Sequence, residues 1–315
     1  MEVEENEIER RGRVLLTGAT GFLGHGLVPG LSAAGFKIRA ASRDAIALSS
    51  EIESAVVGDL RRPINLSEAL RDVDFVVHSA GLANAAAGVP EETYREVNAG
   101  ITNTLAIAAR KAGVRRFVLL SSVRAQIGPT SSGVVTEDQP ARPLDAYGRS
   151  KLEAEQLLAD SGVPFVILRL ALTHGAGMRF NMLELLQLAR SRWPLPLGAF
   201  RAKRSILARD HLVDAVALAA SNREMEEEIY NVADPDALSV GEMIAAFRSG
   251  WNRSPRLIPV PPAFVVLASR PFGRQDKIRR LRQQLVVDPS KLISAGWTPR
   301  RSAFKALAET ARASE

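Results

Sequence analysis

Short apolar runs alternate with stretches of helical spacing through the first half of the chain. The runs cover residues 14–17, 38–41, 55–57, 75–77, 117–120 and 165–168. The helical patterns between them cover residues 21–34, 66–71, 91–111 and 147–160. Runs that are apolar on both faces are typical of strands in a parallel sheet that is covered by helices on both sides. The alternation therefore predicts an α/β fold built on a doubly wound parallel sheet.

A glycine-rich turn follows the first apolar run and opens the first helix. Gly18 permits the tight turn, Gly21 lets the backbone approach a pyrophosphate, and Gly24 lets helix and strand pack closely. The start of the helix supplies free N–H groups and the positive end of the helix dipole. This context predicts a Rossmann core in which a dinucleotide is bound by Gly18, Gly21, Phe22, Leu23 and Gly24.

The residues that end the second and third runs bear on which dinucleotide is bound. An acid at the end of the second strand takes the ribose hydroxyls of NAD, whereas an arginine pairs with the 2′-phosphate of NADP. Ser42 and Arg43 follow the strand directly and Asp44 comes one residue later, an order that favours NADP over NAD. Asp59, with Leu60 beside it, is placed to accept from the adenine amino group or to cap the next turn.

The pattern loosens near residue 170, where prolines begin to interrupt the chain. Helices are expected at residues 182–190, 210–220 and 240–247, and short strands at 205–208 and 229–232. We expect a flexible leader at residues 1–12 and the dinucleotide-binding core at 13–170. Residues 171–315 are expected to form mainly a smaller C-terminal substrate-binding lobe, interleaved with the core.

Several classes of chemistry are excluded by composition and spacing. The chain of 315 residues has no cysteine, so it has no disulfide framework, no Cys-ligated metal centre and no thiol nucleophile. Its four histidines are scattered without His-x-x-x-His spacing, and no metal site is expected. No Gly-x-Ser-x-Gly elbow of a serine hydrolase occurs.

The charge balance indicates anionic partners. The chain has 41 Lys and Arg against 35 Asp and Glu, a net charge of +6. Part of the excess forms a cluster at Arg270, Arg274, Lys277, Arg279, Arg280 and Arg282. No nucleic-acid recognition motif or aromatic platform accompanies it, so no specific nucleic acid is expected, and contact with an anionic lipid surface stays open.

The hydropathy pattern bears on location. No apolar run approaches the roughly 18 residues of a membrane-spanning helix, and the N-terminal residues are charged where a signal peptide is apolar. The sequence therefore predicts a cytoplasmic protein without a transmembrane segment. Residues 263–268 are expected to form a short buried or interfacial helix.

A phenol and an ammonium lie on one helix face. Tyr147 and Lys151 are at positions i and i+4. Lowering a phenol pKa from about 10 to about 7 takes about 4 kcal/mol, and a cation at about 4 Å supplies that much at an effective dielectric of about 20. The pair therefore predicts acid/base chemistry. Ser121 and Ser122 end a neighbouring strand and point to opposite faces, so at most one of them serves the same site.

In this order, the motifs resemble the extended short-chain dehydrogenase/reductases, the epimerase/dehydratase family. The resemblance covers residues 13 to about 310. It rests on the Gly18–Gly24 turn, His78-Ser-Ala80-Gly81, Val97-Asn98-Ala-Gly, Ser121-Ser122 and Tyr147–Lys151. The resemblance implies that Tyr147 is the acid/base and that Lys151 lowers the pKa of Tyr147 and binds the nicotinamide ribose. It implies that Ser122 hydrogen-bonds the substrate oxygen. Asn98, Ala80 and Gly81 are implied on the cofactor side of the site.

The second half of the chain carries its own part of the resemblance. Asn181 stands where relatives contact a nucleotide diphosphate, and Arg204 where an arginine clamps it. The segment Asp288–Pro299 resembles the end of UDP-hexose epimerases and 4-keto-reductases. The resemblance implies a homodimeric NAD(P)-dependent 4-epimerase or 4-keto-reductase of a nucleotide sugar.

Two departures keep alternatives open. Gly128 stands six positions after Ser122, where relatives have five, so a one-residue insertion or a shifted role keeps Ser121 a candidate hydroxyl. Arg43 fits a reductase that releases NADP at each turnover. A carbonyl or alcohol oxidoreductase that uses NADP on a non-sugar substrate is an alternative enzyme. A non-catalytic NADP sensor and a nucleic-acid-binding protein are the alternatives outside enzymes.

Overall fold

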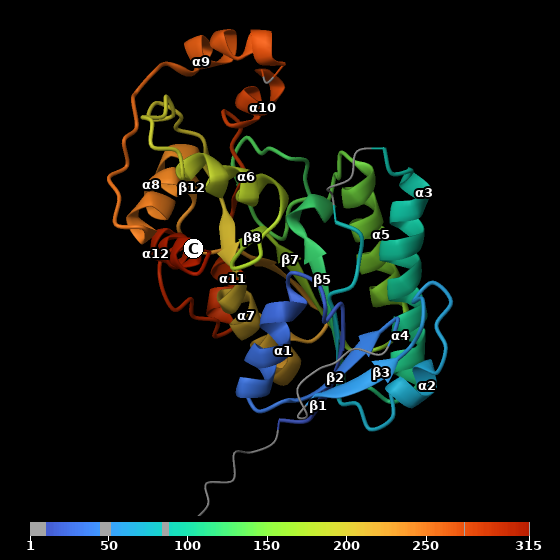
Figure 1. Cartoon of the computed structure of the whole chain (residues 1–315). Coiled ribbons are helices and arrows are strands. Elements are labelled where there is room, and N and C mark those ends of the chain that lie inside the picture. The colour runs from blue at the N-terminus through green and yellow to red at the C-terminus, as the bar shows by residue number, and fades with distance from the viewer. Residues whose placement is uncertain (1–10, 45–51, 84–87, 274, 315) are drawn as a thin grey trace, which may run out of the picture.

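Seven parallel strands form the central sheet of the structure, a computed structural model that describes residues 11–44, 52–83, 88–273 and 275–314 (Figure 1). The expected leader thus lies almost wholly outside the described residues, as does Arg274. The strands are β1 (Arg13–Thr17), β2 (Lys37–Ser42), β3 (Glu53–Val56), β4 (Phe75–His78), β5 (Arg116–Ser122), β7 (Phe165–Leu170) and β11 (Glu228–Val232). Every strand pairing in this sheet is parallel, which confirms the predicted fold class.

The strand order places a crevice at one edge of the sheet. The order is β3-β2-β1-β4-β5-β7-β11, so the chain reverses its direction of winding between β1 and β4. Ligands of open α/β sheets bind beyond the carboxyl ends of the strands at such a reversal. Thr17, His78 and Ser122 end the three strands nearest to it.

Helices cover both faces of the sheet. α1 (Gly24–Ala33) packs against α7 (Arg209–Ser221) on one face, and α4 (Ile101–Lys111) against α5 (Ala146–Asp160) on the other. Successive side chains of β1 enter different cores, since Leu16 packs on the α1 face and Leu15 on the α4 face. Burial on both faces explains why the apolar runs of the inner strands show no polar alternation, whereas the edge strand β3 is mostly exposed.

One expected helix has an internal irregularity. Residues 91–111 form α3 (Glu91–Tyr94), a π-helical segment η1 (Arg95–Gly100) and then α4. A π turn adds a residue to the helical repeat and is often found at functional sites.

The remaining elements build a second unit of packing beside the sheet. Its apolar cluster joins α6 (Phe180–Ala189), α8 (Val240–Gly250) and α12 (Ala303–Arg312). Short strand pairs link this region to the core, namely β8 (Leu172–His174) with β10 (Ile206–Ala208), β9 (Lys203–Arg204) with β12 (Leu238–Ser239), and β6 (Val134–Val135) with β13 (Val286–Val287). Both β11 and α7 come from the second half of the chain and complete the core.

Four short helices complete the structure, α2 (Leu66–Ala69), α9 (Pro262–Ala268), α10 (Gln275–Arg280) and α11 (Ser290–Ser294). α9 and α10 stand away from the sheet at one end of the molecule (Figure 1). Within the described part of the chain, none of the helices combines the length and the apolar character needed to cross a bilayer.

Candidate functional site

The turn between β1 and α1 is packed so closely that two of its positions exclude side chains. Gly18 has a φ of +73°, and a Cβ there would lie 2.8 Å from the backbone nitrogen of Ala80. A Cβ on Gly24 would overlap the carbonyl oxygen of Gly18. A Cβ on Gly21 would meet only that same oxygen, at 3.2 Å, among the described residues beyond its chain neighbours. The open side at Gly21 and the start of α1 together fit a dinucleotide pyrophosphate.

Phe22 and Leu23, the two residues between Gly21 and Gly24, are packed against the rest of the protein. Arg209 donates a hydrogen bond to the carbonyl oxygen of Phe22 at 3.1 Å, and its guanidinium lies 5.3 Å from the centre of the Phe22 ring. Leu23 packs against the core on the α1 face. The backbone of the turn is therefore fixed by the fold.

A hydrogen-bonded pair fixes the next turn of the crevice. The Oγ1 of Thr17 lies 2.7 Å from Nδ1 of His78 and accepts the backbone N–H of Ala80 at 3.1 Å. His78 is buried, and burial together with the charge of Lys151 lowers its pKa to about 3, so the ring is neutral. Ala80 is thereby held beside Gly18.

Asn98 joins the turn after β4 to helix α5. It lies in η1, where its Oδ1 accepts the N–H of Leu82 at 2.8 Å. Its Nδ2 donates to the carbonyl oxygen of Leu82 at 3.2 Å and to Oγ of Ser150 at 2.9 Å. A Cβ on Gly81 would lie 2.8 Å from Oδ1 of Asn98. The amide therefore sets the position of the Gly81 backbone relative to α5.

Lys151 reaches the same turn from α5. Its Nζ donates to the carbonyl oxygen of Leu120 at 2.8 Å, and a Cβ on Gly81 would lie 3.7 Å from Nζ. Burial lowers the pKa of Lys151 to about 8, and the charge of Glu155 acts in the opposite direction. The Lys151 ammonium thus lies beside the Gly81 backbone, which is expected to contact the cofactor. An ammonium in this position can donate hydrogen bonds to ribose hydroxyls.

Tyr147 faces Ser122 and not Ser121. Helix α5 begins after Asp145, whose carboxylate accepts the N–H of Gly148 at 2.7 Å and so places Tyr147 in the first turn. The Ser122 side chain is close enough to the Tyr147 phenol to act on its pKa, which it lowers. Ser121 points to the other face of β5 and donates to the buried carboxylate of Glu155. Of the two candidate hydroxyls, Ser122 is the one beside the phenol.

The charge that acts on the phenol comes from an unexpected residue. Burial raises the pKa of Tyr147, while the hydrogen bond with Ser122 and the charge of Arg124 act to lower it. The Lys151 ammonium donates to the Leu120 carbonyl oxygen, and its expected effect on the Tyr147 phenol stays a prediction.

Arg124 is a site residue that sequence reasoning missed. Its guanidinium is mostly buried and forms an ion pair with Asp145, the residue that caps α5. A Cβ on Gly148 would overlap the carbonyl oxygen of Arg124, so the start of α5 packs directly on this segment. The available signal was a cation two residues after the strand-end serines, but only the return of the chain at α5 places it beside Tyr147.

A second arginine lies close to the first. The charge of Arg204 contributes to lowering the pKa of Arg124, after burial. Arg204 donates to the carbonyl oxygens of Pro129 at 3.0 Å and Gln283 at 2.9 Å, and burial lowers its pKa. Among the described residues it has no carboxylate partner. Arg124 and Arg204 together form a positive surface next to Tyr147 that suits a diphosphate. Asn181, the other residue expected to contact a diphosphate, is exposed in the first turn of α6.

The far end of the crevice holds the residues expected to select the dinucleotide. Arg43 is exposed directly after β2, and the Ser42 hydroxyl donates to a nearby backbone carbonyl. Asp59 accepts the side chain of Arg61 at 2.9 Å and its N–H at 3.0 Å, and mainly these bonds lower the pKa of Asp59 to about 2. Leu60 packs on the core. The sequence left two roles for Asp59, adenine binding and capping of a turn. In this structure Asp59 caps a turn.

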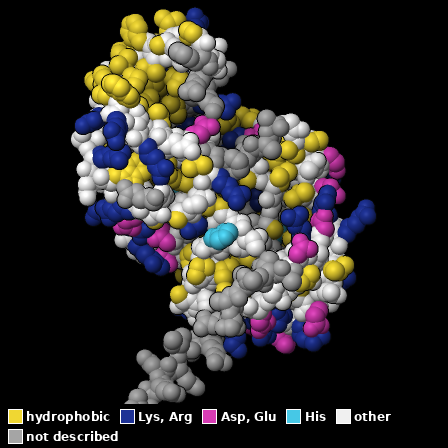
Figure 2. Space-filling view, in the orientation of Figure 1, with side chains coloured by type: hydrophobic (Ala, Val, Ile, Leu, Met, Phe, Trp, Pro, Cys, Tyr) yellow, Lys and Arg dark blue, Asp and Glu magenta, His cyan; other side chains and the backbone are white. Residues whose placement is uncertain are grey.

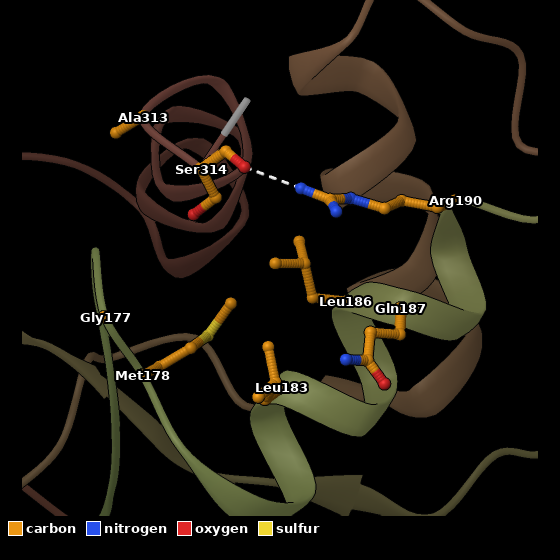
Figure 3. Close-up of a pocket in the computed structure, with 8 residues that line it drawn as sticks. All are labelled: Gly177, Met178, Leu183, Leu186, Gln187, Arg190, Ala313 and Ser314. Carbon is orange, nitrogen blue, oxygen red and sulfur yellow. Dashed lines mark hydrogen bonds between the residues drawn. The ribbon is translucent and has the colours of Figure 1, made fainter.

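A separate hollow of about 270 Å³ lies between α6 and the end of α12. Met178, Leu186 and Arg190 line it, and Arg190 closes one side by donating to the carbonyl oxygen of Ser314 at 2.6 Å (Figure 3). It shares no lining residue with the site around Tyr147.

Comparisons with known proteins show which sequences and structures the chain is similar to. The sequence matches the model of the NAD dependent epimerase/dehydratase family over residues 14–233. It is 32% identical over 312 residues to UDP-glucose 4-epimerase from Vibrio cholerae, a match that covers 95% of this chain and 94% of the relative. It is 28% identical over 272 residues, 84% of this chain and 80% of the relative, to N-acetyl-alpha-D-glucosaminyl-diphospho-ditrans,octacis-undecaprenol 4-epimerase from Escherichia coli O157:H7.

The fold is also similar to solved structures. MoeE5 in complex with UDP-glucuronic acid and NAD superposes with a TM-score of 0.76 at 25% sequence identity. The match covers 96% of this chain and 98% of that one.

Proposed function

The chain belongs to the NAD dependent epimerase/dehydratase family, and from this premise we propose that it is a nicotinamide-dependent 4-epimerase of a nucleotide sugar. The observation that carries the proposal is the half-buried Tyr147 in the first turn of α5, where Ser122 at the carboxyl end of β5 and the charge of Arg124 both act to lower the pKa of its phenol. The relative named UDP-glucose 4-epimerase supports a UDP-hexose as substrate.

The glycine turns supply the binding surface for the cofactor. When bound, a nicotinamide dinucleotide supplies a hydride acceptor at the sugar carbon. The turn from Gly18 to Gly24 would bind the pyrophosphate, and Lys151 would bind the nicotinamide ribose beside Gly81. Family membership and the NAD in the MoeE5 complex support NAD as a cofactor.

Tyr147 would move the proton of the reacting hydroxyl. In the oxidising direction the phenolate takes the hydroxyl proton, and in the return direction the phenol gives it back. Ser122 would donate a hydrogen bond to the same sugar oxygen and hold it near Tyr147. Because burial alone favours the neutral phenol, Arg124 provides the charge that stabilises the phenolate.

The sugar would be held by its diphosphate. Arg204 is a planar donor whose charge acts on Arg124, and it is bonded to the carbonyl oxygen of Pro129 after β5. We assign diphosphate binding to Arg204, with Asn181 as a further contact from α6, and substrate binding mainly to residues 171–315.

The proposal is tested by following interconversion of UDP-glucose and UDP-galactose with catalytic NAD. We expect interconversion without net accumulation of NADH. Tyr147→Phe should lower kcat by about 10²- to 10⁴-fold while cofactor binding is kept. Tyr230→Phe, in the buried strand β11, is the matched control and should keep its activity. Full activity of Tyr147→Phe would exclude the acid/base assignment.

A 4-keto-reductase is the second candidate, and Arg43 favours it. An exposed arginine directly after β2 is placed for the 2′-phosphate of NADP, which a reductase releases at each turnover. The reductase would oxidise one NADPH per UDP-4-keto-hexose reduced. Arg43→Ala should then weaken binding of NADP much more than binding of NAD, and equal effects on both would exclude the 2′-phosphate contact.

A further inference from the structure

Helices α9 and α10 project from the lobe at the end of the molecule farthest from the described start of the chain (Figure 1). We use the name α9–α10 protrusion for residues 262–273 and 275–282. The two helices contact each other, and Val265, Ile278 and Leu281 pack partly against the lobe core. These three side chains fix the inner side of the protrusion.

The outer side of α9 is apolar and uncovered. None of its seven residues is buried, and Phe264 and Leu267 are 65% and 57% exposed. Ile258, shortly before the helix, is 47% exposed. Figure 2 shows hydrophobic side chains gathered over this end of the molecule. An exposed apolar patch of this kind marks a surface that binds a partner.

The charge around the patch is strongly positive. Residues 252–287 contain eight Lys and Arg but a single acid, Asp276. Arg270 directly follows α9, and Arg280 and Arg282 lie at the end of α10, all three exposed. Apolar side chains flanked by arginines are the pattern of helices that lie in the interface of an anionic membrane.

The same charge argues against a second copy of the chain as the occupant. A symmetric contact through this face would bring two sets of these arginines together, and like charges facing each other oppose association. Nucleic acid would satisfy the arginines but leave Phe264 and Leu267 in water.

The α9–α10 protrusion also adjoins the candidate site. Arg204 donates to the carbonyl oxygens of Gln283 at 2.9 Å and Arg280 at 3.4 Å. The segment that ends the protrusion therefore contacts Arg204, whose charge acts on the site residue Arg124.

We propose that the α9–α10 protrusion is a membrane-docking surface that binds an anionic lipid bilayer. Phe264 and Leu267 enter the interface, and Arg270, Arg280 and Arg282 contact lipid phosphates. Docking places the site next to the bilayer. The proposal goes beyond the proposed function and does not depend on it.

The test is flotation of the full chain with lipid vesicles. We expect it to float with phosphatidylcholine vesicles that contain about 30% phosphatidylglycerol and to stay behind with pure phosphatidylcholine. Raising NaCl from about 0.1 M to about 0.5 M should weaken binding, because salt screens the arginines.

Two variants separate the contributions of the patch. Phe264→Asp/Leu267→Asp should abolish flotation. Arg270→Gln/Arg280→Gln/Arg282→Gln should lower partitioning by about a hundredfold, since each cation near an anionic surface contributes about fivefold. The charge-matched control Arg62→Gln/Lys111→Gln/Arg223→Gln and the apolar control Ile293→Asp change residues exposed elsewhere and should float like the unchanged protein.

Activity without vesicles, measured on the same variants, separates docking from catalysis. The docking variants should keep the circular dichroism and the turnover of the unchanged protein. Failure of the unchanged protein to bind anionic vesicles would overturn the proposal, as would equal loss of binding in the controls. Concentration-dependent dimerisation that Phe264→Asp/Leu267→Asp removes, without vesicle binding, would assign the face to a second copy and also overturn it.

Discussion

Tyr147 shows how two opposing effects act on one side chain. Burial makes the phenolate costly, because a charge loses its hydration. The hydrogen bond with Ser122 and the charge of Arg124 act against that effect. An acid/base group needs access to both protonation states, so the residues that stabilise the phenolate bear on the rate as directly as the phenol does.

Replacing Arg124 should therefore change the pH dependence of the reaction. In Arg124→Gln the pKa of Tyr147 is expected to move further above its usual value, because the charge that lowers it is removed. The rise of kcat with pH should shift to higher pH, and activity near neutral pH should fall. The pH profile of kcat measures this.

The conservative variant provides the control. Arg124→Lys keeps the positive charge, so its profile should lie near that of the unchanged protein. An unshifted profile in Arg124→Gln, even with reduced activity, would mean that Arg124 only positions Asp145 and α5.

The serines mark the limit of residue-scale prediction. Alternation along a strand predicted that Ser121 and Ser122 face opposite ways. Which of them meets Tyr147 depends on where α5 lies, and the pattern of β5 carries no information about that.

At the scale of elements, α5 connects the site to the core. Tyr147, Lys151 and Glu155 follow at intervals of four and share one face of the helix. At the inner end, Glu155 accepts from Arg169 of β7 at 2.6 Å and from Ser121 of β5, with Glu155 and Arg169 almost fully buried. This cluster fixes the helix to two strands of the sheet and so sets the height of Tyr147 above them.

Breaking the cluster should strongly destabilise the fold. Glu155→Ala leaves the Arg169 guanidinium buried without a counter-charge, which costs about 3–5 kcal/mol in the free energy of unfolding. Glu153→Ala on the same helix removes an exposed ion pair with Arg95 and should cost at most about 1 kcal/mol. Urea denaturation of both variants measures the difference, and equal losses would refute the anchoring role.

The elements themselves were largely predictable. The six apolar runs lie in strands, and five of them record burial on both faces, whereas the edge strand β3 is mostly exposed. The interruption at η1 was not predictable from residues 91–111, since the contacts of Asn98 with Leu82 and Ser150 come from other parts of the chain.

At the scale of the whole molecule, buried neutral histidines connect distant segments. His78 at the end of β4 is bonded to Thr17, and His174 of β8 lies 3.1 Å from the Thr310 hydroxyl of the last helix. Burial is the main cause that lowers the pKa of each to about 3. His174 is thus a packing residue with no exposed surface.

These histidines predict loss of stability in acid. An unfolded histidine takes up a proton near pH 6.5, whereas the folded ones resist protonation until about pH 3. Between these values the unfolded state binds more protons, so stability is complete above about pH 6.5 and falls as the pH is lowered. Each histidine contributes a slope of up to about 1.4 kcal/mol per pH unit.

Urea denaturation at about pH 7.5, 6 and 5 tests this. His174→Gln should reduce the slope of stability against pH, whatever its effect at neutral pH. His25→Gln changes an exposed histidine and should leave the slope unchanged. An unaltered slope in His174→Gln would show that this ring does not resist protonation in the folded state.

Local order along the chain was enough to predict six strands of the sheet, the glycine turn after β1 and the helix face that carries Tyr147 and Lys151. Each depends on residues within a few positions of one another, where backbone geometry and burial produce a periodic pattern of apolar residues in the sequence. The tertiary structure alone determined that Arg124 faces Tyr147, that β11 completes the sheet and that Arg204 meets the segment after α10. These contacts join residues tens to hundreds of positions apart, and their approach depends on how the whole chain packs.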